Sequence, residues 1–170
     1  MTPSPHFVAK RVTLTRVQTY AAPPVVVFPL HGPLEEAAWA VGWDPEMIHP
    51  TGGPATEGAV FVTRHGGAEA VWVLATWDPR EGRVGYVHVT AGRDVTDIHI
   101  RVSGPEGGPT RVEVTYTWTA LSPAGNAFAE AQTEESFRQM MDEWEEEMAH
   151  YLRTGRKLER HPVSEAADER

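Results

Sequence analysis

The chain has 170 residues, a size that suits one domain with a sizeable hydrophobic core. Hydrophobic residues make up 41% and charged residues 23%, which argues against a disordered chain, and no apolar run reaches the roughly 18 residues of a membrane span. Because there is no cysteine, disulfides, thiolate metal sites and cysteine nucleophiles are excluded. A formal net charge of −9 disfavours nucleic acid as a partner. With no secretion signal in sight, we expect a cytoplasmic location.

Residues 1–6 and 156–170 are polar and carry no apolar period, so we expect disordered tails around a single domain of residues 7–155. Residues 7–20 are rich in Val, Thr and Leu and predict a long first strand. Prolines then recur through residues 23–33, where they can open short helices but soon break them. We therefore predict two short helices after the first strand, the second over residues 34–40 and ended by Gly42.

Six further strands are predicted over residues 47–50, 59–65, 70–78, 83–90, 95–103 and 110–121. The gaps between the later strands carry turn residues, namely "GG" at 66–67, "DPREG" at 78–82, "AGRD" at 91–94 and "GPEGG" at 104–108. Such short connections join antiparallel neighbours. The tripeptide "WDP" occurs at 43–45 and 77–79, and we interpret it as turn chemistry rather than as a repeat or an acid–base site.

The longest predicted element is a helix over residues 126–153. Its apolar residues recur at steps of four and three and form one stripe: Phe137, Met141, Trp144, Met148 and Tyr151. Over residues 126–153 eight acidic residues stand against two basic ones, Arg138 and Arg153, which is typical of a solvated face, with an acidic docking surface as the alternative. Only this helix is long enough to cover a curved sheet. The predicted fold class is α+β, with a curved antiparallel sheet of about seven strands wrapped on a long C-terminal helix.

This order of elements and four local segments resemble the START-like, Bet v 1-like superfamily of helix-grip proteins (SRPBCC), which includes polyketide cyclase/dehydrase-like lipid-transport proteins. The segments are "APPVVVFPL" at 22–30, "GWDPEMI" at 42–48, "TRVEVTYTWTALSPAGN" at 110–126 and "FRQMMDEWEEEMAHYLRTG" at 137–155. The resemblance covers residues 8–158. It implies a cavity between sheet and helix for an apolar or amphipathic small molecule, but no particular reaction, because members include carriers, receptors, cyclases and co-chaperones.

The turns also predict how the strands pair. If residues 92–93 form a two-residue turn, Tyr86 lies opposite His99 and His88 opposite Asp97. If the loop after Gly104 pairs Val102 with Val112, Ile98 lies opposite Tyr116. Because side chains alternate along a strand, the residues of the later strands fall on two faces of the sheet. The apolar face is expected to pack against the long helix, since burying apolar side chains is favourable. That inner face is predicted to hold Val87, Val89, Ile98, Ile100, Val102, Val112, Val114, Tyr116 and Trp118.

The same register carries Trp72 and Leu74 to the inner face beside Phe61. We therefore predict a cup lined by Phe61, Trp72, Tyr116, Trp118, Met141 and Trp144, and the resemblance places Trp43 at its mouth. Aromatic walls with a few polar tips suit a flat or ring-shaped apolar ligand. The alternative is that these side chains fill a solid core.

A polar cluster of Tyr86, His88, Asp97 and His99 is the sharpest chemical candidate. Two imidazoles near a carboxylate could bind a metal or form an acid–base pair. The predicted register places the cluster on the outer, solvated face, where such residues are ordinary, so we predict no metal site. A slip of one residue would reverse this. His49, just before a proline, is interpreted as a turn residue.

On the outer face, the earlier strands are predicted to carry Val60, Val62, Val73, Ala75, Trp77 and Val84. Such a patch is too apolar for open water. Either the register fails at the turn of residues 66–67, or the patch is an interface, for which we expect a homodimer.

Three functions remain open at this point. The first is a binding protein for a small hydrophobic or aromatic molecule. The second is a cyclase or lyase for a polyketide-like substrate, which positions the substrate and moves a proton with an inward-facing His, Tyr or Asp. The third is a co-chaperone-like interaction protein with a filled core. No GxSxG, P-loop, HExxH or GxGxxG motif is present, and we expect no cofactor.

Overall fold

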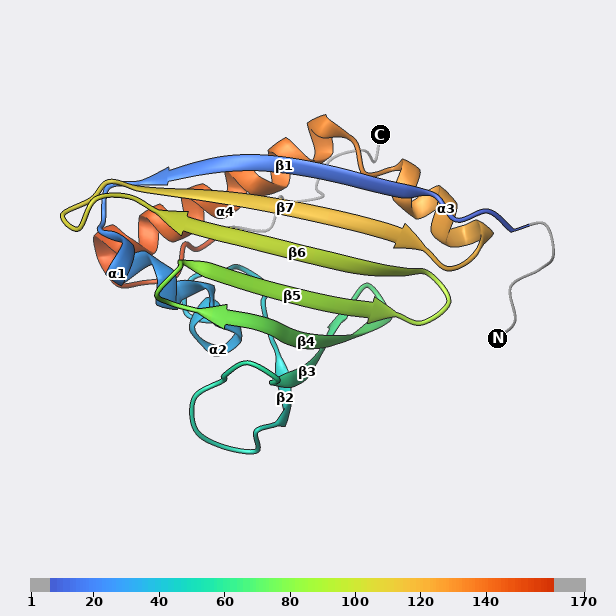
Figure 1. Ribbon diagram of the computed structural model, residues 1–170, viewed down its shortest axis with the longest axis horizontal. Helices are drawn as coiled ribbons and strands as arrows, with labels where there is room; N and C mark the ends of the chain where they lie inside the picture. Colours follow the sequence, from blue (N-terminus) through green and yellow to red (C-terminus); the bar gives the residue numbers. More distant parts are fainter. Residues whose placement is uncertain (1–6, 161–170) are drawn as a thin grey trace, which may run out of the picture.

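A computed structural model describes residues 7–160. The predicted tail of residues 1–6 lies outside them, and so do residues 161–170 of the predicted tail 156–170. The elements are, in chain order (Figure 1), β1 (Arg11–Tyr20), α1 (Pro24–Val27), the 3-10 helix η1 (Phe28–His31), α2 (Pro33–Glu36), β2 (Glu46–His49), β3 (Val60–His65), β4 (Ala68–Asp78), β5 (Arg83–Thr90), β6 (Asp94–Ser103), β7 (Thr110–Ala120), α3 (Pro123–Glu130) and α4 (Glu134–Thr154). None of the helices in this part of the chain is both long and apolar enough to cross a membrane.

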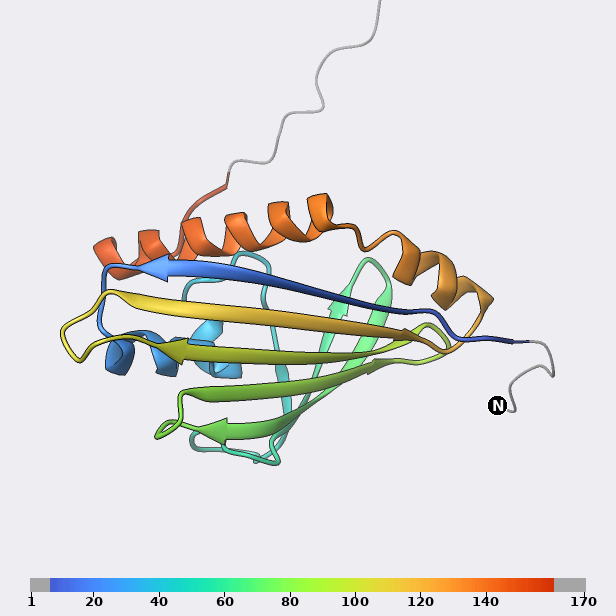
Figure 2. The ribbon, with the colours of Figure 1, turned by 45° about the horizontal axis from the view of Figure 1, so that its top comes forward.

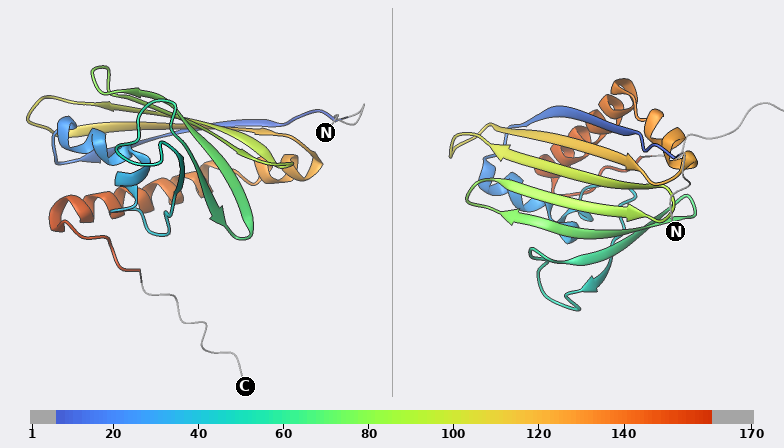
Figure 3. Two further views of the ribbon diagram at one scale, coloured as in Figure 1. Left: turned by 90° about the horizontal axis from the view of Figure 1, so that it is seen from below. Right: turned by 45° about the vertical axis from the view of Figure 1, so that its right-hand side comes forward.

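The seven strands form one antiparallel sheet in the order β1-β7-β6-β5-β4-β3-β2. The sheet curves, and α4 runs beneath its inner face on the same side as α1 and α2 (Figures 2 and 3). The short helices close one end of the space between sheet and α4. These features confirm the predicted α+β class: a curved antiparallel sheet, a long C-terminal helix and short helices after the first strand.

Hydrogen bonds between β1 and α4 hold the long helix against the sheet. Gln18 is only 2% exposed, and its Nε2 donates to the backbone oxygen of Met141 at 2.8 Å. The backbone N–H of Thr19 donates to Glu145 Oε1 at 2.7 Å. The acidic residues of α4 are therefore not all a plain solvated face, since Glu145 and Glu147 accept backbone N–H groups from β1 and from the segment after α2.

The C-terminal helix is broken, which the sequence analysis did not predict. Instead of one helix from residue 126, the chain forms α3 and α4 with residues 131–133 between them. Thr133 begins the second helix with a capping box: its hydroxyl accepts from the backbone N–H of Ser136 at 3.1 Å, and the Ser136 hydroxyl accepts from Thr133 N–H at 3.0 Å. The predicted apolar stripe on α4 is present, with Phe137, Met141 and Met148 buried.

The β5–β6 connection is a three-residue loop, so the predicted two-residue turn is wrong. Gly92 adopts a φ of 72°, and the loop makes Thr90 the partner of Asp94. As a result Tyr86 pairs with Ile98 and His88 with Thr96, one position away from the predicted register. The β6–β7 register, with Ile98 opposite Tyr116 and Val102 opposite Val112, is as predicted.

This slip exchanges the two faces of β5. Val87 and Val89, predicted to lie inside, point outward, and Val89 is 39% exposed. Val84 and Tyr86 point inward and are buried. A bulge between Leu74 and Thr76 on β4 shifts that strand by one position as well. The bulge restores Trp72 and Leu74 to the inner face, where the sequence analysis placed them.

The segment after α4 folds back on the helix for as far as the structure describes it. Residues 156–160 fall within the predicted tail, yet Arg160 Nε donates to Glu147 Oε1 at 2.9 Å. Glu147 is 4% exposed, and its other carboxylate oxygen accepts from the backbone N–H of Val41 at 3.0 Å. Arg160 therefore contacts α4 although it lies past residue 155, the predicted end of the domain.

Candidate functional site

The inner face of β3, β4 and β5 carries a compact group of aromatic rings. Phe61 is completely buried and stacks on Trp72, with ring centroids 5.6 Å apart and planes 12° from parallel. Tyr86 meets both rings edge-on, at 6.1 Å from Phe61 and 6.0 Å from Trp72. The Trp72 indole N–H donates to Thr63 Oγ1 at 2.8 Å, so its orientation is fixed. Two of the predicted lining residues, Phe61 and Trp72, are thus in direct contact.

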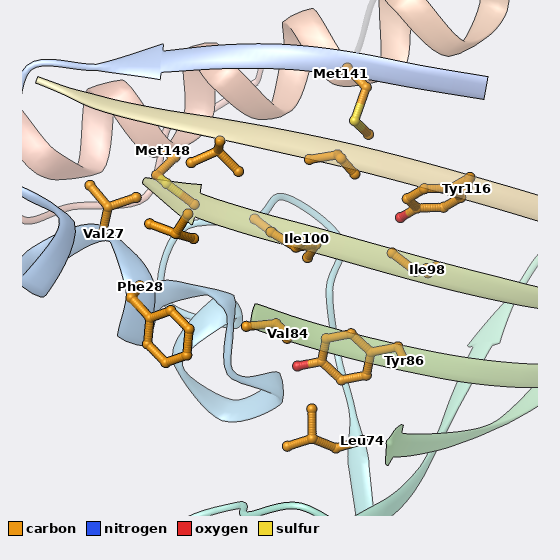
Figure 4. Close-up of a cluster of buried hydrophobic side chains, with 14 of the residues drawn as sticks. Val27, Phe28, Leu74, Val84, Tyr86, Ile98, Ile100, Tyr116, Met141 and Met148 are labelled. Carbon is orange, nitrogen blue, oxygen red and sulfur yellow. The ribbon is translucent and has the colours of Figure 1, made fainter. Parts of the chain in front are cut away.

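A second aromatic group joins β7 to α4. Tyr116 lies 5.3 Å from Trp118, 5.4 Å from Phe137 and 6.4 Å from Trp144 between ring centroids. Tyr116 and Trp118 are buried, Trp144 is half-buried, and Met141 of α4 is completely buried. The figure shows Met141 reaching from α4 toward the sheet, and Tyr116 and Ile98 side by side on neighbouring strands (Figure 4). The predicted lining residues of β7 and α4 therefore share this inner space.

Trp43 connects the short helices to the first aromatic group. It is half-buried, and its ring meets Trp72 edge-on at 5.2 Å and Phe61 at 5.9 Å. Its indole N–H donates to the backbone oxygen of Pro33 at 2.8 Å. The first "WDP" segment therefore anchors α2 to the sheet. In the second, Asp78 Oδ1 accepts from the backbone N–H groups of Arg80 and Glu81, as expected for a turn.

Glu36 of α2 is the residue that the sequence analysis missed. It shares the inward side of this segment with Trp39 and Ala40, and only 6% of it is exposed. Burial raises its pKa to about 8. Within residues 7–160 no ion pair or side-chain hydrogen bond offsets that burial. Because α2 has only four residues, and Trp39 and Ala40 lie beyond its end, no helical period in the sequence marks Glu36 as buried.

His31 and Tyr86 add further polar atoms to the same region. The Tyr86 hydroxyl donates to the backbone oxygen of His31 at 2.6 Å, and Figure 4 shows it pointing toward the short helices. Burial lowers the pKa of His31 to about 4, so its ring is neutral. Its Nε2 is buried and has no hydrogen-bond partner among the described residues. Burial, and after it the charge of Glu36, raise the pKa of both Tyr86 and Tyr116.

The predicted polar cluster is divided between the two faces of the sheet. Tyr86 and His88 lie inside, because of the three-residue loop. His88 is packed against Trp72 with ring centroids 4.1 Å apart, and burial lowers its pKa to about 4. Its Nδ1 is also without a partner in the described part of the chain. Asp97 and His99 remain outside, where His99 Nε2 lies 3.3 Å from Asp97 Oδ1 with both side chains exposed.

The outer face carries an apolar patch, but its members differ from those predicted. Trp77 and Val84 lie inside: the Trp77 ring is 4.8 Å from Phe28, and Val84 is 1% exposed. Paired valines of four strands make up the outer valine patch: Val60, Val62, Val71, Val73, Val87, Val89 and Val95. A homodimer through this face stays a prediction.

A surface hollow of about 490 Å³ lies at the end of the sheet, between α1, η1 and the β4–β5 and β6–β7 turns. Phe28 and Val102 belong both to its lining and to the buried core. The hollow is therefore separated from the inner aromatic groups by core side chains. Gly82 borders it, and a Cβ there would stand 2.1 Å from the backbone oxygen of Val102.

The fold resembles that of several solved structures, although sequence identity is low. Norcoclaurine synthase from Thalictrum flavum, a point mutant in complex with a transition-state analogue, matches with a TM-score of 0.61 and 10% identity over 88% of this chain and 100% of that chain. The Mll3558 protein from Rhizobium loti matches with a TM-score of 0.59 and 18% identity over 85% and 99% of the two chains.

DynU16, a protein of the dynemicin biosynthetic locus, matches with a TM-score of 0.57 and 18% identity over 85% of this chain. The match covers 48% of DynU16, so this chain spans about half the length of that protein. No protein-family model matches the sequence, and neither does any curated protein. The similarity to Bet v 1-like and polyketide cyclase-like structures establishes the helix-grip fold.

Proposed function

We propose that this helix-grip protein binds a small hydrophobic or aromatic molecule in the cup between the inner face of the sheet, α2 and α4. The proposal is based on a few polar groups that lie buried in an otherwise aromatic and aliphatic interior. Within residues 7–160, His31 Nε2 and His88 Nδ1 are buried without a hydrogen-bond partner, and the carboxyl group of Glu36 is buried enough to raise its pKa to about 8. Leaving a buried polar group unsatisfied costs about 1–3 kcal/mol, so native proteins keep few of them.

A bound molecule would explain why several such atoms occur in one domain. Ligand sites are mostly apolar and contain a few convergent polar groups that fix orientation. Here the walls come from Phe61, Trp72, Tyr116 and their neighbours, and the polar tips come from η1, α2 and β5. A structure of norcoclaurine synthase, with the same fold at 12% identity and a TM-score of 0.58, is a complex with dopamine and hydroxybenzaldehyde. That complex supports a small aromatic molecule as the class of ligand.

Native mass spectrometry of the purified protein, before and after organic extraction, tests this proposal. We expect added mass that extraction removes, from a molecule that Trp72→Ala no longer retains. Trp77→Ala is the matched control, because Trp77 is a half-buried tryptophan of the same strand that packs against Phe28 instead. A bare mass, together with no melting shift across a panel of aromatic molecules and lipids, would exclude the carrier function.

A second candidate function is supported by the inward-facing titratable groups. Glu36 and His31 are both buried, and Tyr86 links them: its hydroxyl donates to the backbone oxygen of His31, and the charge of Glu36, after burial, raises its pKa. An acid and a base that are shielded from water can transfer protons to and from a substrate. A cyclase or lyase would use the cup to position a polyketide-like substrate. The test is deuterium exchange at the methyl group next to the carbonyl of 2-acetylnaphthalene in D₂O. We expect exchange with the wild type and with Glu35→Gln, and none above background with Glu36→Gln; equal rates in all three would contradict catalysis.

A further inference from the structure

Glu36 is a buried residue of α2, the short helix that we propose as one border of the cup. Glu36 lies at the end of α2, and Tyr86 of β5 and Tyr116 of β7 are close enough for its charge to affect them. Its neighbour Glu35 is exposed, so the two glutamates of α2 point in different directions. Of these two glutamates only Glu36 is buried, although the charge of Glu35, after burial and the charge of Glu36, also contributes to the raised pKa of Tyr86.

Within residues 7–160 no cation acts on Glu36, since burial is the cause of its raised pKa. The titratable groups on the inner side of η1 and β5 are His31 and His88, which burial keeps neutral because it lowers the pKa of each to about 4. The hydroxyls of Tyr86 and Tyr116 are also neutral, since their pKa values are raised. On α4, the buried Glu147 is paired with Arg160 of the C-terminal segment.

In these surroundings the acid form of Glu36 is the stable one. An unpaired buried carboxylate loses its hydration without compensation, and the raised pKa of about 8 expresses that cost. A protonated carboxyl group is a hydrogen-bond donor as well as an acceptor. Its O–H group can donate a hydrogen bond to an acceptor atom of a ligand.

We infer that Glu36 selects the ligand of the cup: the site takes an uncharged aromatic molecule with an acceptor oxygen, such as a ketone, that receives a hydrogen bond from the Glu36 carboxyl group. This inference rests on the proposed function. A cationic amine would have to lose its own hydration and form an ion pair with a glutamate that is only 6% exposed, and such buried pairs rarely repay their desolvation. An anion would meet a carboxyl group in a protein that is already strongly acidic.

Three probes of the same shape test the inference by titration calorimetry. They are 2-acetylnaphthalene, 2-isopropylnaphthalene and the ammonium form of 1-(2-naphthyl)ethylamine. We expect the ketone to bind about tenfold more tightly than the other two, because only it accepts the hydrogen bond. Glu36→Leu should abolish the preference for the ketone, and the matched variant Glu35→Gln should keep it. Equal affinity for the ketone and the hydrocarbon would overturn the inference alone, whereas no binding of any probe would overturn the proposed function with it.

The pH dependence separates a neutral ligand from a cationic one. The ketone should bind with constant affinity below about pH 8 and lose roughly tenfold between about pH 8 and pH 9.5, as Glu36 gives up its proton. In Glu36→Gln the amide donates at every pH, so the affinity for the ketone should be flat over the same range. Tighter binding of the ammonium probe, with an affinity that rises toward about pH 8, would show that Glu36 acts as a carboxylate and would refute the inference.

Discussion

Glu36→Gln is expected to stabilise the protein at alkaline pH and to leave its stability nearly unchanged at acidic pH. Burial raises the pKa of Glu36 from 4.5 to about 8 in the folded state. Between these values the folded protein keeps a proton that the unfolded chain releases, so raising the pH favours unfolding. The wild type therefore has its full stability from this group below about pH 4.5 and loses it as the pH rises through about 8.

The expected gain is large because the glutamate is deeply buried. At about 1.4 kcal/mol for each pKa unit, the difference corresponds to roughly 3–5 kcal/mol once the group is ionised in both states. Glutamine keeps the shape of the side chain and cannot ionise. Urea unfolding at about pH 5, 7 and 9 measures the effect, with Glu35→Gln as the exposed control. If wild type and Glu36→Gln lose stability in parallel as the pH rises, Glu36 is not held in its acid form.

His31 and His88, which lie on the inner side of the fold, determine how the stability of the protein changes at acidic pH. Burial lowers the pKa of His31 and His88 from 6.5 to about 4. Between these pH values the histidines bind protons in the unfolded chain but not in the folded protein. Stability from these rings is present above about pH 6.5 and is lost as the pH falls through about 4. With Glu36 acting in the opposite sense, we expect the wild type to be most stable near pH 6.5. Replacing Glu36 should extend that maximum into the alkaline range.

The sequence predicted the fold because each strand and its turns carry local signals. Alternation placed Ile98, Ile100, Val114 and Tyr116 on one face, and the β6–β7 register followed from a short loop. The β5 register failed because a loop of two and a loop of three residues around Gly92 look alike in the sequence. A difference of one residue in the loop moves every side chain of β5 to the opposite face of the sheet. The bulge in β4 also shifts the register by one position without a signal in the sequence. It offsets the error in the β5 register, so Trp72 lies on the predicted face.

The aromatic part of the candidate site could be predicted, and its polar part could not. Phe61, Trp72, Tyr116 and Trp118 lie on strands, where alternation decides the face. Glu36 and His31 lie on helices of four residues between prolines, which are too short to display a period. Their burial depends on how α2 docks against the sheet and α4, and that docking rests on tertiary contacts such as Trp43 with Pro33 and Val41 with Glu147.

Phe61→Ala is expected to destabilise the protein by about 3–5 kcal/mol, the range for removing a buried phenylalanine. Phe61 is completely buried, and its ring contacts Trp72, Trp43 and Tyr86, which come from three other segments of the chain. Alanine would leave a cavity between a stacked and two edge-on partners, and rigid rings cannot collapse into it. Urea unfolding measures the loss, and Phe61→Leu, which keeps most of the volume, should cost about 1.5 kcal/mol or less.

This variant also distinguishes a cup from a solid core. If the aromatic groups border a binding space, added indole should stabilise the wild type as well as Phe61→Ala. If they fill a solid core, indole should stabilise only Phe61→Ala, whose new cavity it fills. A loss well below 1 kcal/mol for Phe61→Ala would mean that the rings rearrange freely. In that case Phe61 and Trp72 would not form a rigid wall, and the interior would accept ligands of many shapes rather than one specific shape.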